Sequence, residues 1–121
     1  MRDFKKYTIW VDSMKLVKDI YKVVEVFPKE EKYGLSSQIC RATISIPSNI
    51  AEGASRKGIN DFKRFLEIAL GSSFELETQL LIAIDLGFTK DMEINLILNR
   101  IVQLQKQINS LIVKLEGDLK N

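Results

Sequence analysis

The sequence contains no histidine and only one cysteine, Cys40. Without histidine, a Ser-His-Asp triad, a histidine general base and an imidazole-bound metal are all excluded. A single cysteine can form neither an internal disulfide nor a thiolate metal cage, which suits a reducing cytoplasm. We therefore expect no metal and no cofactor. Only six glycines and two prolines are available for turns, so long helices are favoured over a sheet.

Hydrophobic residues make up 45% of the 121 residues and charged residues 28%, a balance typical of a folded globular protein. This length favours one domain, spanning residues 1–121. The first residues, Met1–Lys6, lack an apolar signal region, and no apolar run approaches the length of a membrane span. The net charge of +2 is too small to indicate nucleic-acid binding by itself. We expect a small soluble helical domain in the cytoplasm, with no membrane contact.

Apolar periodicity predicts four helices, at about residues 8–26, 35–53, 60–86 and 90–117. The expected inner faces of the first two are Trp10, Met14, Val17, Tyr21 and Val24, and then Leu35, Ile39, Ala42, Ile46 and Ile50. Those of the third and fourth are Phe62, Leu66, Ala69, Ser73, Leu76, Leu80 and Ala83, and then Ile94, Ile97, Ile101, Leu104, Ile108, Leu111 and Leu115. Four long helices with short connections predict an all-α fold, an antiparallel up-down-up-down four-helix bundle.

Capping residues and helix breakers mark the expected helix ends. The expected N-caps are Thr8 and either Asn60 or Asp61, Gly53 is the expected C-cap of the second helix, and Pro28 and Gly87 end the first and third. Pro47 lies well inside the second helix, where a proline removes one backbone hydrogen bond and usually causes a kink.

A stripe of polar residues runs beside the apolar face of the second helix. It consists of Gln38, Arg41, Ser45, Asn49 and Glu52. Serine and asparagine are poor helix formers, so their presence indicates packing or hydrogen-bonding requirements. In the third helix, Gly71-Ser72-Ser73 is small enough for another helix to approach closely. One interpretation is a polar network between helices, made by Gln38, Asn49, Glu52, Glu75 and Glu77 with Arg41 and Arg64.

A second interpretation, which stays open beside the first, concerns basic residues near the connection between the second and third helices. In this interpretation Arg41, Arg56, Lys57, Lys63 and Arg64 form a surface that binds phosphates, with affinity that falls steeply as salt rises. Basic residues exceed acidic ones over residues 1–64, and the reverse holds over 65–121, which favours a polarised surface. We interpret Trp10 and Tyr21 as core or interface anchors rather than base-stacking platforms, and Cys40 as a small buried hydrophobe.

Apolar residues also lie outside the expected inner faces of the third and fourth helices. They are Ile68, Leu70, Leu81, Ile82, Leu98 and Ile112. A lone bundle needs one apolar stripe per helix, so broader stripes indicate a second buried interface. We therefore expect a homo-oligomer.

Five segments of the chain are distinctive. They are Leu35–Ala42, Ser45–Gly53, Arg64–Leu66, Ala69–Ser72 and Glu75–Leu80, and Phe27–Glu31 and Leu86–Gly87 accompany them. Together they resemble the bacterial four-helix-bundle proteins of the 23S rRNA intervening-sequence type, and the segment Ser45–Gly53 is highly specific for that family. One departure is Cys40, where the family usually carries a second basic residue beside Arg41.

The resemblance implies an antiparallel four-helix bundle that assembles as a ring-like homopentamer. It also implies similarity to the accessory protein of diversity-generating retroelements, which binds nucleic acid and the reverse transcriptase. The family is sometimes labelled a ribosomal protein because its genes lie in insertions of the large-subunit rRNA gene. The resemblance implies no catalytic residues.

These observations favour a non-enzymatic oligomer that binds RNA or DNA. A weak basic patch, repeated around a ring, would gain avidity without strong charge on each subunit. The alternative is a protein-interaction adaptor that docks a partner such as a reverse transcriptase without direct nucleic-acid contact. An enzyme is not expected, because the sequence has no histidine, no paired carboxylates and no cofactor motif.

Overall fold

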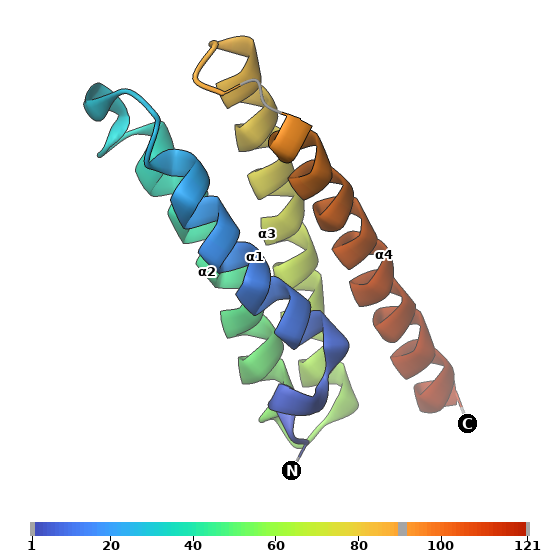
Figure 1. The fold of residues 1–121 in the computed structure, drawn as a ribbon. Helices are drawn as coiled ribbons and strands as arrows, with labels where there is room; N and C mark the ends of the chain where they lie inside the picture. The colour runs from blue at the N-terminus through green and yellow to red at the C-terminus, as the bar shows by residue number, and fades with distance from the viewer. Residues whose placement is uncertain (1, 90–91, 121) are drawn as a thin grey trace.

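The computed structural model describes residues 2–89 and 92–120 and contains four long helices. These are α1 (Thr8–Val24), α2 (Leu35–Ala54), α3 (Ile59–Asp85) and α4 (Met92–Lys120), and no strand occurs among the described residues. Two short 3₁₀-helices, η1 (Phe4–Lys6) and η2 (Lys29–Glu31), precede α1 and α2. Consecutive helices run in opposite directions (Figure 1), which confirms the predicted antiparallel up-down-up-down bundle. The start expected for the fourth helix, Lys90, lies outside the described residues.

The apolar faces predicted for α2, α3 and α4 form most of the core. Every predicted position of α3 is buried. In α2 and α4 the predicted positions are also buried, except Leu35 and Leu111, which are half-buried against the core. α4 also buries Ile112, so one residue predicted to lie at an outer interface belongs to the core. Apolar and small residues spaced at three and four positions specify these faces.

The inner face of α1 differs from the prediction by a rotation of the helix. Its buried residues are Ile9, Ser13, Leu16 and Ile20. Met14 and Tyr21, from the predicted stripe, are exposed instead. Two apolar stripes lie side by side on this helix, and the buried one contains the small Ser13, which permits close packing. The other stripe carries aromatic side chains with polar tips, which are stable at the boundary with water.

Backbone geometry, rather than side-chain capping, starts two of the helices. Thr8 is the first residue of α1 and not its N-cap, while Asn60 and Asp61 lie in the first turn of α3. The preceding residue makes no side-chain cap in either helix, so these two N-cap predictions are wrong. The predicted stops are confirmed: α1 ends before Pro28, and Gly87 follows α3 with φ of 76°, in the left-handed region that glycine tolerates.

Gly53 is not the C-cap of α2, because the helix continues to Ala54. It is buried where α2 packs on α3. A Cβ atom at this position would lie 2.7 Å from Cβ of Phe65 and 3.0 Å from Cδ1 of Phe62. Only glycine permits this approach of the two helices. Pro47 is also buried inside α2, and the helix continues through it.

The four helices share their contacts unequally. Among the four pairs of neighbouring helices, α2 and α3 form the most extensive contact, and α1 and α4 form the least extensive one. The α1–α4 side is therefore the more open side of the bundle. None of the described helices combines the length and the apolar character needed to traverse a lipid bilayer.

We expect Gly53→Ala to lower the free energy of unfolding by about 1–3 kcal/mol, because the added methyl group overpacks the α2–α3 contact. Urea unfolding followed by circular dichroism measures this change. Gly117→Ala is the matched control, since a Cβ atom there meets nothing within 4 Å and alanine favours a helix. Equal stability of the two variants would show that the α2–α3 contact tolerates a side chain.

Candidate nucleic-acid interface

The α2–α3 connection carries a hollow whose charged lining residues are all cations. Arg2, Ser55, Arg56 and Lys57 enclose about 680 Å³. The guanidinium of Arg2 lies 4.6 Å from the ring centroid of Phe62 and donates a hydrogen bond to the carbonyl of Arg56 at 2.5 Å. Sequence reasoning missed Arg2, because no local pattern indicates that the start of the chain returns to the α2–α3 connection.

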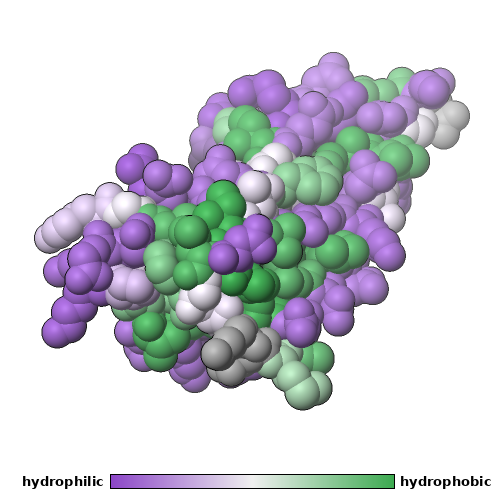
Figure 2. All heavy atoms as spheres, turned by 90° about the horizontal axis from the view of Figure 1, so that it is seen from above, coloured by the Kyte–Doolittle hydropathy of each residue, from purple (hydrophilic) through white to green (hydrophobic). Residues whose placement is uncertain are grey.

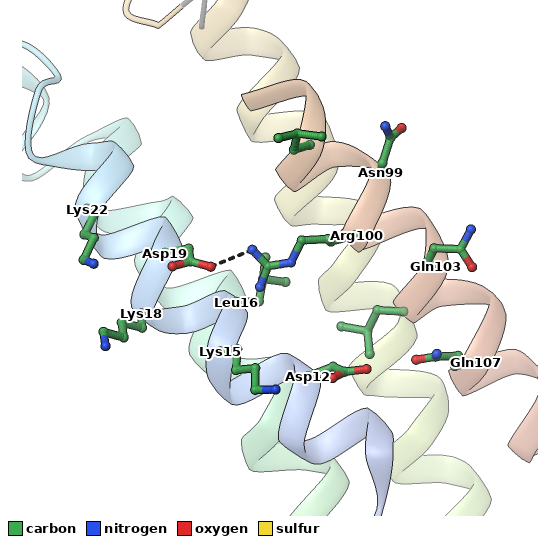
Figure 3. Close-up of a pocket in the computed structure, with 12 residues that line it drawn as sticks. Asp12, Lys15, Leu16, Lys18, Asp19, Lys22, Asn99, Arg100, Gln103 and Gln107 are labelled. Atoms are coloured by element: carbon green, nitrogen blue, oxygen red, sulfur yellow. Dashed lines mark hydrogen bonds and ion pairs between the residues drawn. The ribbon is translucent and has the colours of Figure 1, made fainter. Parts of the chain in front are cut away.

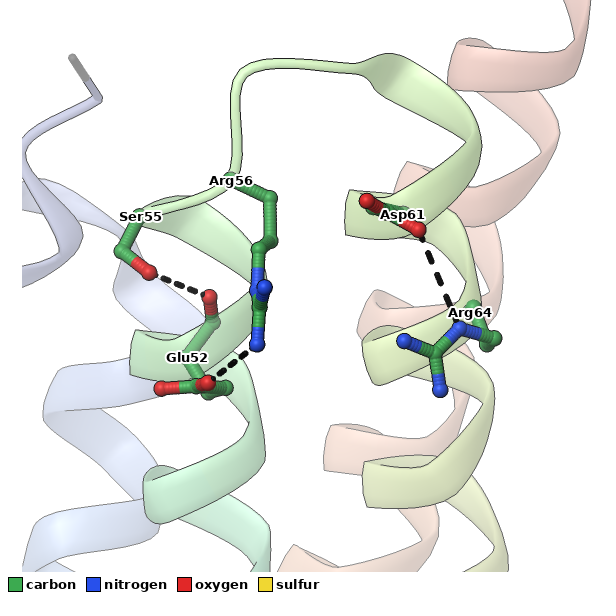
Figure 4. A network of polar contacts seen from close by, with 5 residues as sticks. All are labelled: Glu52, Ser55, Arg56, Asp61 and Arg64. Carbon is green, nitrogen blue, oxygen red and sulfur yellow. Dashed lines mark hydrogen bonds and ion pairs between the residues drawn. The ribbon is translucent and has the colours of Figure 1, made fainter.

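Figure 4 shows Arg56 in the connection after α2 and Arg64 on α3. Both guanidinium groups stack on Phe65, at 5.0 Å and 4.5 Å from its ring centroid. Arg56 pairs with Glu52 at 2.6 Å, and Arg64 pairs with Asp61 at 3.9 Å. These pairs are exposed and contribute little to stability. They nevertheless compensate part of the positive charge that the sequence suggested for this surface.

The two lysines of the predicted surface differ in their surroundings. Nζ of Lys63 lies 3.5 Å from Oε1 of Glu116 on α4 and 3.9 Å from Oε1 of Glu67, so its charge is compensated. Lys57 is exposed and forms no ion pair within 4 Å with another described residue. At this end of the bundle, Lys57 is thus the predicted cation whose charge is most available to a ligand.

Arg41 does not belong to the same surface as the other four predicted residues. It lies near the start of α2, whereas Arg56 follows its end. At about 1.5 Å per residue, the two positions are separated by about 22 Å along the helix axis. The predicted single basic surface is therefore divided between the two ends of the bundle.

The polar network predicted between helices is only partly present. Asn49 donates hydrogen bonds to the carbonyl and hydroxyl oxygens of Ser45, at 2.8 Å and 2.9 Å. The Ser45 hydroxyl lies 2.8 Å from that of Ser72, which joins α2 to α3 through the small residues. Glu77 instead joins α3 to α4, because Gln105 donates to its carboxylate at 2.8 Å.

The remaining members of the predicted network do not join α2 to α3. Glu52 bonds Arg56, four residues along the chain, and Glu75 accepts a hydrogen bond from Gln79 within α3 at 3.4 Å. Gln38 is exposed. A polar stripe at helical spacing therefore identified the α2–α3 contact but not which of its side chains make the bonds.

A second hollow, of about 810 Å³, lies between α1 and α4. Leu16 and Leu104, both buried, line its base. Figure 3 shows Arg100 reaching from α4 to Asp19 on α1, at 2.6 Å. Lys18 points away from α4 in the same view. Because the walls carry charges of both signs, this hollow is not a uniformly basic groove.

Cys40 is half-buried beside Tyr21 of α1. Burial raises the pKa of the Cys40 thiol above its ordinary value, and a hydrogen bond with Tyr21 partly lowers it. Burial also raises the pKa of the Tyr21 hydroxyl, and Cys40 adds to that rise. A protonated thiol is a poor nucleophile and metal ligand. No cluster of three or more potential metal ligands occurs in the part of the chain that the structure describes.

The architecture defines an all-α, antiparallel four-helix-bundle protein with a cation-lined end. The family model described as 23S rRNA-intervening sequence protein matches residues 5–110, and the chain belongs to this family. The resemblance carried by the sequence segments is thereby confirmed.

A similar fold and sequence similarity are found in a solved structure. It is a protein of unknown function from the S23 ribosomal protein family of Bacteroides thetaiotaomicron, 26% identical, with a TM-score of 0.78. The match covers 87% of this chain and 98% of that one. No curated protein matches the sequence.

We expect the rate of Cys40 alkylation to rise with pH through a midpoint above the ordinary thiol pKa of about 8.5. Because the thiolate is the reactive form, a raised pKa makes the reaction at pH 8 slower than that of a free thiol. Tyr21→Phe removes the hydrogen bond that lowers the Cys40 pKa, so the midpoint should move higher still. Iodoacetamide kinetics followed by mass spectrometry measure it.

Tyr7→Phe is the matched control for this measurement, because Tyr7 packs on Phe62, far along the bundle from Cys40. It should leave the midpoint unchanged. A wild-type midpoint at or below that of a free thiol would contradict the environment described for Cys40.

Proposed function

We propose that this protein is a non-enzymatic homo-oligomer of the cytoplasm that binds nucleic acid through the cation-lined end of its bundle. The observation that carries the proposal is the hollow lined by Arg2, Ser55, Arg56 and Lys57, whose described lining residues include no carboxylate. Lysine and arginine side chains are usual protein contacts to phosphate oxygens. The family description names the 23S rRNA intervening sequence, so RNA is the first ligand to test and DNA the second.

Oligomerisation is part of the proposal because each copy offers a weak site. Arg56 and Arg64 share their charges with neighbouring carboxylates. A ring of copies, which the family resemblance suggests is a pentamer, would present the hollow several times to one strand. Simultaneous contacts raise avidity without any new contact in a single copy.

We expect Arg56→Gln combined with Lys57→Gln to weaken RNA binding and to flatten its salt dependence. For a single strand, each phosphate that the variant no longer neutralises should reduce the slope of log K against log salt by about 0.7. Fluorescence anisotropy of a labelled oligonucleotide, titrated at several salt concentrations, measures both effects. Glutamine keeps the side-chain length and avoids placing a new carboxylate beside Glu52.

Lys106→Gln combined with Lys114→Gln is the matched control, because it removes two exposed charges from α4, outside the hollow. It should change the salt slope less than the Arg56 and Lys57 pair does. If both double variants weakened binding equally, net charge alone would explain the affinity, and the hollow would have no specific role.

The outer side of α3 supports self-association. Its exposed apolar residues are Ile68, Phe74, Leu81 and Ile82. A Cβ atom at Gly71, in the middle of the same helix, would meet nothing within 4 Å. Of the residues expected outside the inner faces, Leu70 and Leu98 pack partly against the core, whereas Ile68, Leu81 and Ile82 are exposed. α4 exposes apolar side chains too, at Met92, Leu96, Val113 and Leu119. Exposed apolar surface of this kind favours a partner surface.

We expect Phe74→Glu combined with Leu81→Glu to shift the assembly toward single copies while the helix content is retained. Both side chains are about half exposed, at 51% and 46%, so the charges should not disturb the core of one copy. Size-exclusion chromatography with light scattering gives the mass. Val26→Glu combined with Leu119→Glu is the control, with the same charge change at helix ends. A wild-type protein that runs as a single copy would refute the assembly.

The alternative function is an adaptor that docks a protein partner, such as a reverse transcriptase, and does not touch nucleic acid. The exposed apolar residues of α3 favour this alternative as well. The two functions respond oppositely to salt, since apolar docking survives high salt and phosphate contacts do not. Purification at low and high salt, with absorbance at two wavelengths to detect nucleic acid, distinguishes them.

A further inference from the structure

A third hollow lies at the opposite end of the bundle, where α1, η2 and the start of α2 meet. Its volume is about 770 Å³, within the range of about 300–1,000 Å³ typical of ligand pockets. Figure 2 looks down on this end of the molecule, where apolar surface lies among polar groups rather than under a continuous layer of charge. The predicted basic residue Arg41 lines this hollow.

Two tyrosines from different elements line the pocket, Tyr21 on α1 and Tyr33 after η2. Tyr33 is 87% exposed and Tyr21 43% exposed, so neither ring is enclosed by the core. Of the two roles predicted for Tyr21, the core anchor is therefore wrong, and the interface anchor stays a prediction. Aromatic rings with accessible faces are the surfaces on which nucleobases stack in proteins that bind single strands.

The apolar part of the pocket is held by the core. Phe27 lines the pocket and is buried, and its ring packs against Phe88 with the centroids 5.7 Å apart. Phe27 therefore cannot move aside to leave a wholly polar surface. An apolar lining held in place favours a flat, weakly hydrated group such as a nucleobase over a bare ion.

Positive charge stands beside the aromatic rings. Nζ of Lys32 lies 5.4 Å from the ring centroid of Tyr33, so an anion bound by Lys32 would be adjacent to a group stacked on that ring. Arg41 is exposed and forms no ion pair within 4 Å with another described residue. It thus differs from Arg56 and Arg64, whose charges are compensated. The lining carries one carboxylate, Glu25, against the cations Lys29, Lys32 and Arg41.

We propose that this pocket binds one nucleotide of a single-stranded nucleic acid. The base stacks on Tyr33 and Tyr21 against Phe27, and Lys32 and Arg41 hold its phosphate. A duplex keeps its bases stacked inside the helix and cannot offer one to the pocket. The inference rests on the proposed function and deepens it, because a base contact at one end joins a phosphate contact at the other. A free nucleoside monophosphate has the same chemistry, so the test separates the two sources.

Cys40 provides the measurement, because it lines the same pocket and is the only cysteine of the chain. Its alkylation by iodoacetamide is followed in the full-length protein with four probes: adenosine 5′-monophosphate, inorganic phosphate, a single-stranded RNA 12-mer and the corresponding duplex. At about ten times its Kd, the single strand should slow alkylation by about tenfold. The monophosphate should do so at higher concentration, and phosphate and duplex should not.

Three variants assign the protection to named groups. Tyr33→Leu and Arg41→Gln should each abolish most of the protection, whereas Tyr33→Phe, which keeps the ring, should retain it. Tyr33 and Arg41 are exposed, so these substitutions leave the core intact. Lys114→Gln is the charge control on α4 and should retain protection. Each comparison uses the ratio of rates with and without probe, which cancels any change in the intrinsic reactivity of Cys40.

Several results would overturn the proposal. Equal protection by inorganic phosphate, or full protection in Tyr33→Leu, would mean a cation site without base stacking. Protection by the monophosphate but not by the strand would assign the pocket to free nucleotides instead. Strand binding detected by anisotropy without any protection of Cys40 would refute the pocket and leave the proposed function standing. No strand binding at low salt would refute the proposed function. Protection of Cys40 by the monophosphate would then show separately whether the pocket binds a nucleotide.

Discussion

The close approach of α2 to α3 at Gly53 is the constraint on which the rest of the arrangement depends. Because Gly53 has no side chain, the backbone of α2 packs directly against Phe62 and Phe65 of α3. The same two rings then support the cations of the α2–α3 end, with Arg2 over Phe62 and Arg56 and Arg64 over Phe65. Packing in the core therefore determines where the charged groups at the surface are held.

The basic residues fall into two groups, those paired with a described carboxylate and those without one. Near the α2–α3 connection, Arg56, Lys63 and Arg64 each have a carboxylate within 4 Å. The carboxylates reduce the positive electrostatic potential of these three side chains. An anionic ligand must therefore compete with the carboxylates for the same cations. Lys57 and Arg41 carry charges that no described carboxylate compensates within the same distance, and they lie at opposite ends of α2. This separation suits an extended ligand better than a compact anion.

Under the proposed function, the exposed residues of α3 would let a weakly charged chain act on a polyanion. An apolar outer side promotes self-association, and self-association repeats both ends of the bundle in space. The chain belongs to the 23S rRNA intervening-sequence family. The similar protein from Bacteroides thetaiotaomicron has the same fold, and its own function is unknown.

Periodicity in the sequence was sufficient to predict four helices, their antiparallel order and the buried faces of α2, α3 and α4, because apolar and small residues recur there at steps of three and four along one side of the helix. It was insufficient for α1, where two apolar stripes compete and only packing against the neighbours selects Leu16 over Tyr21. Residue types alone also identified the basic side chains and the α2–α3 contact. Only the tertiary structure decided which cations are compensated, that Arg2 joins Arg56, and that Tyr21, Tyr33 and Arg41 share a pocket. These features depend on residues far apart in the chain, and their distances are set by helix packing rather than by local sequence.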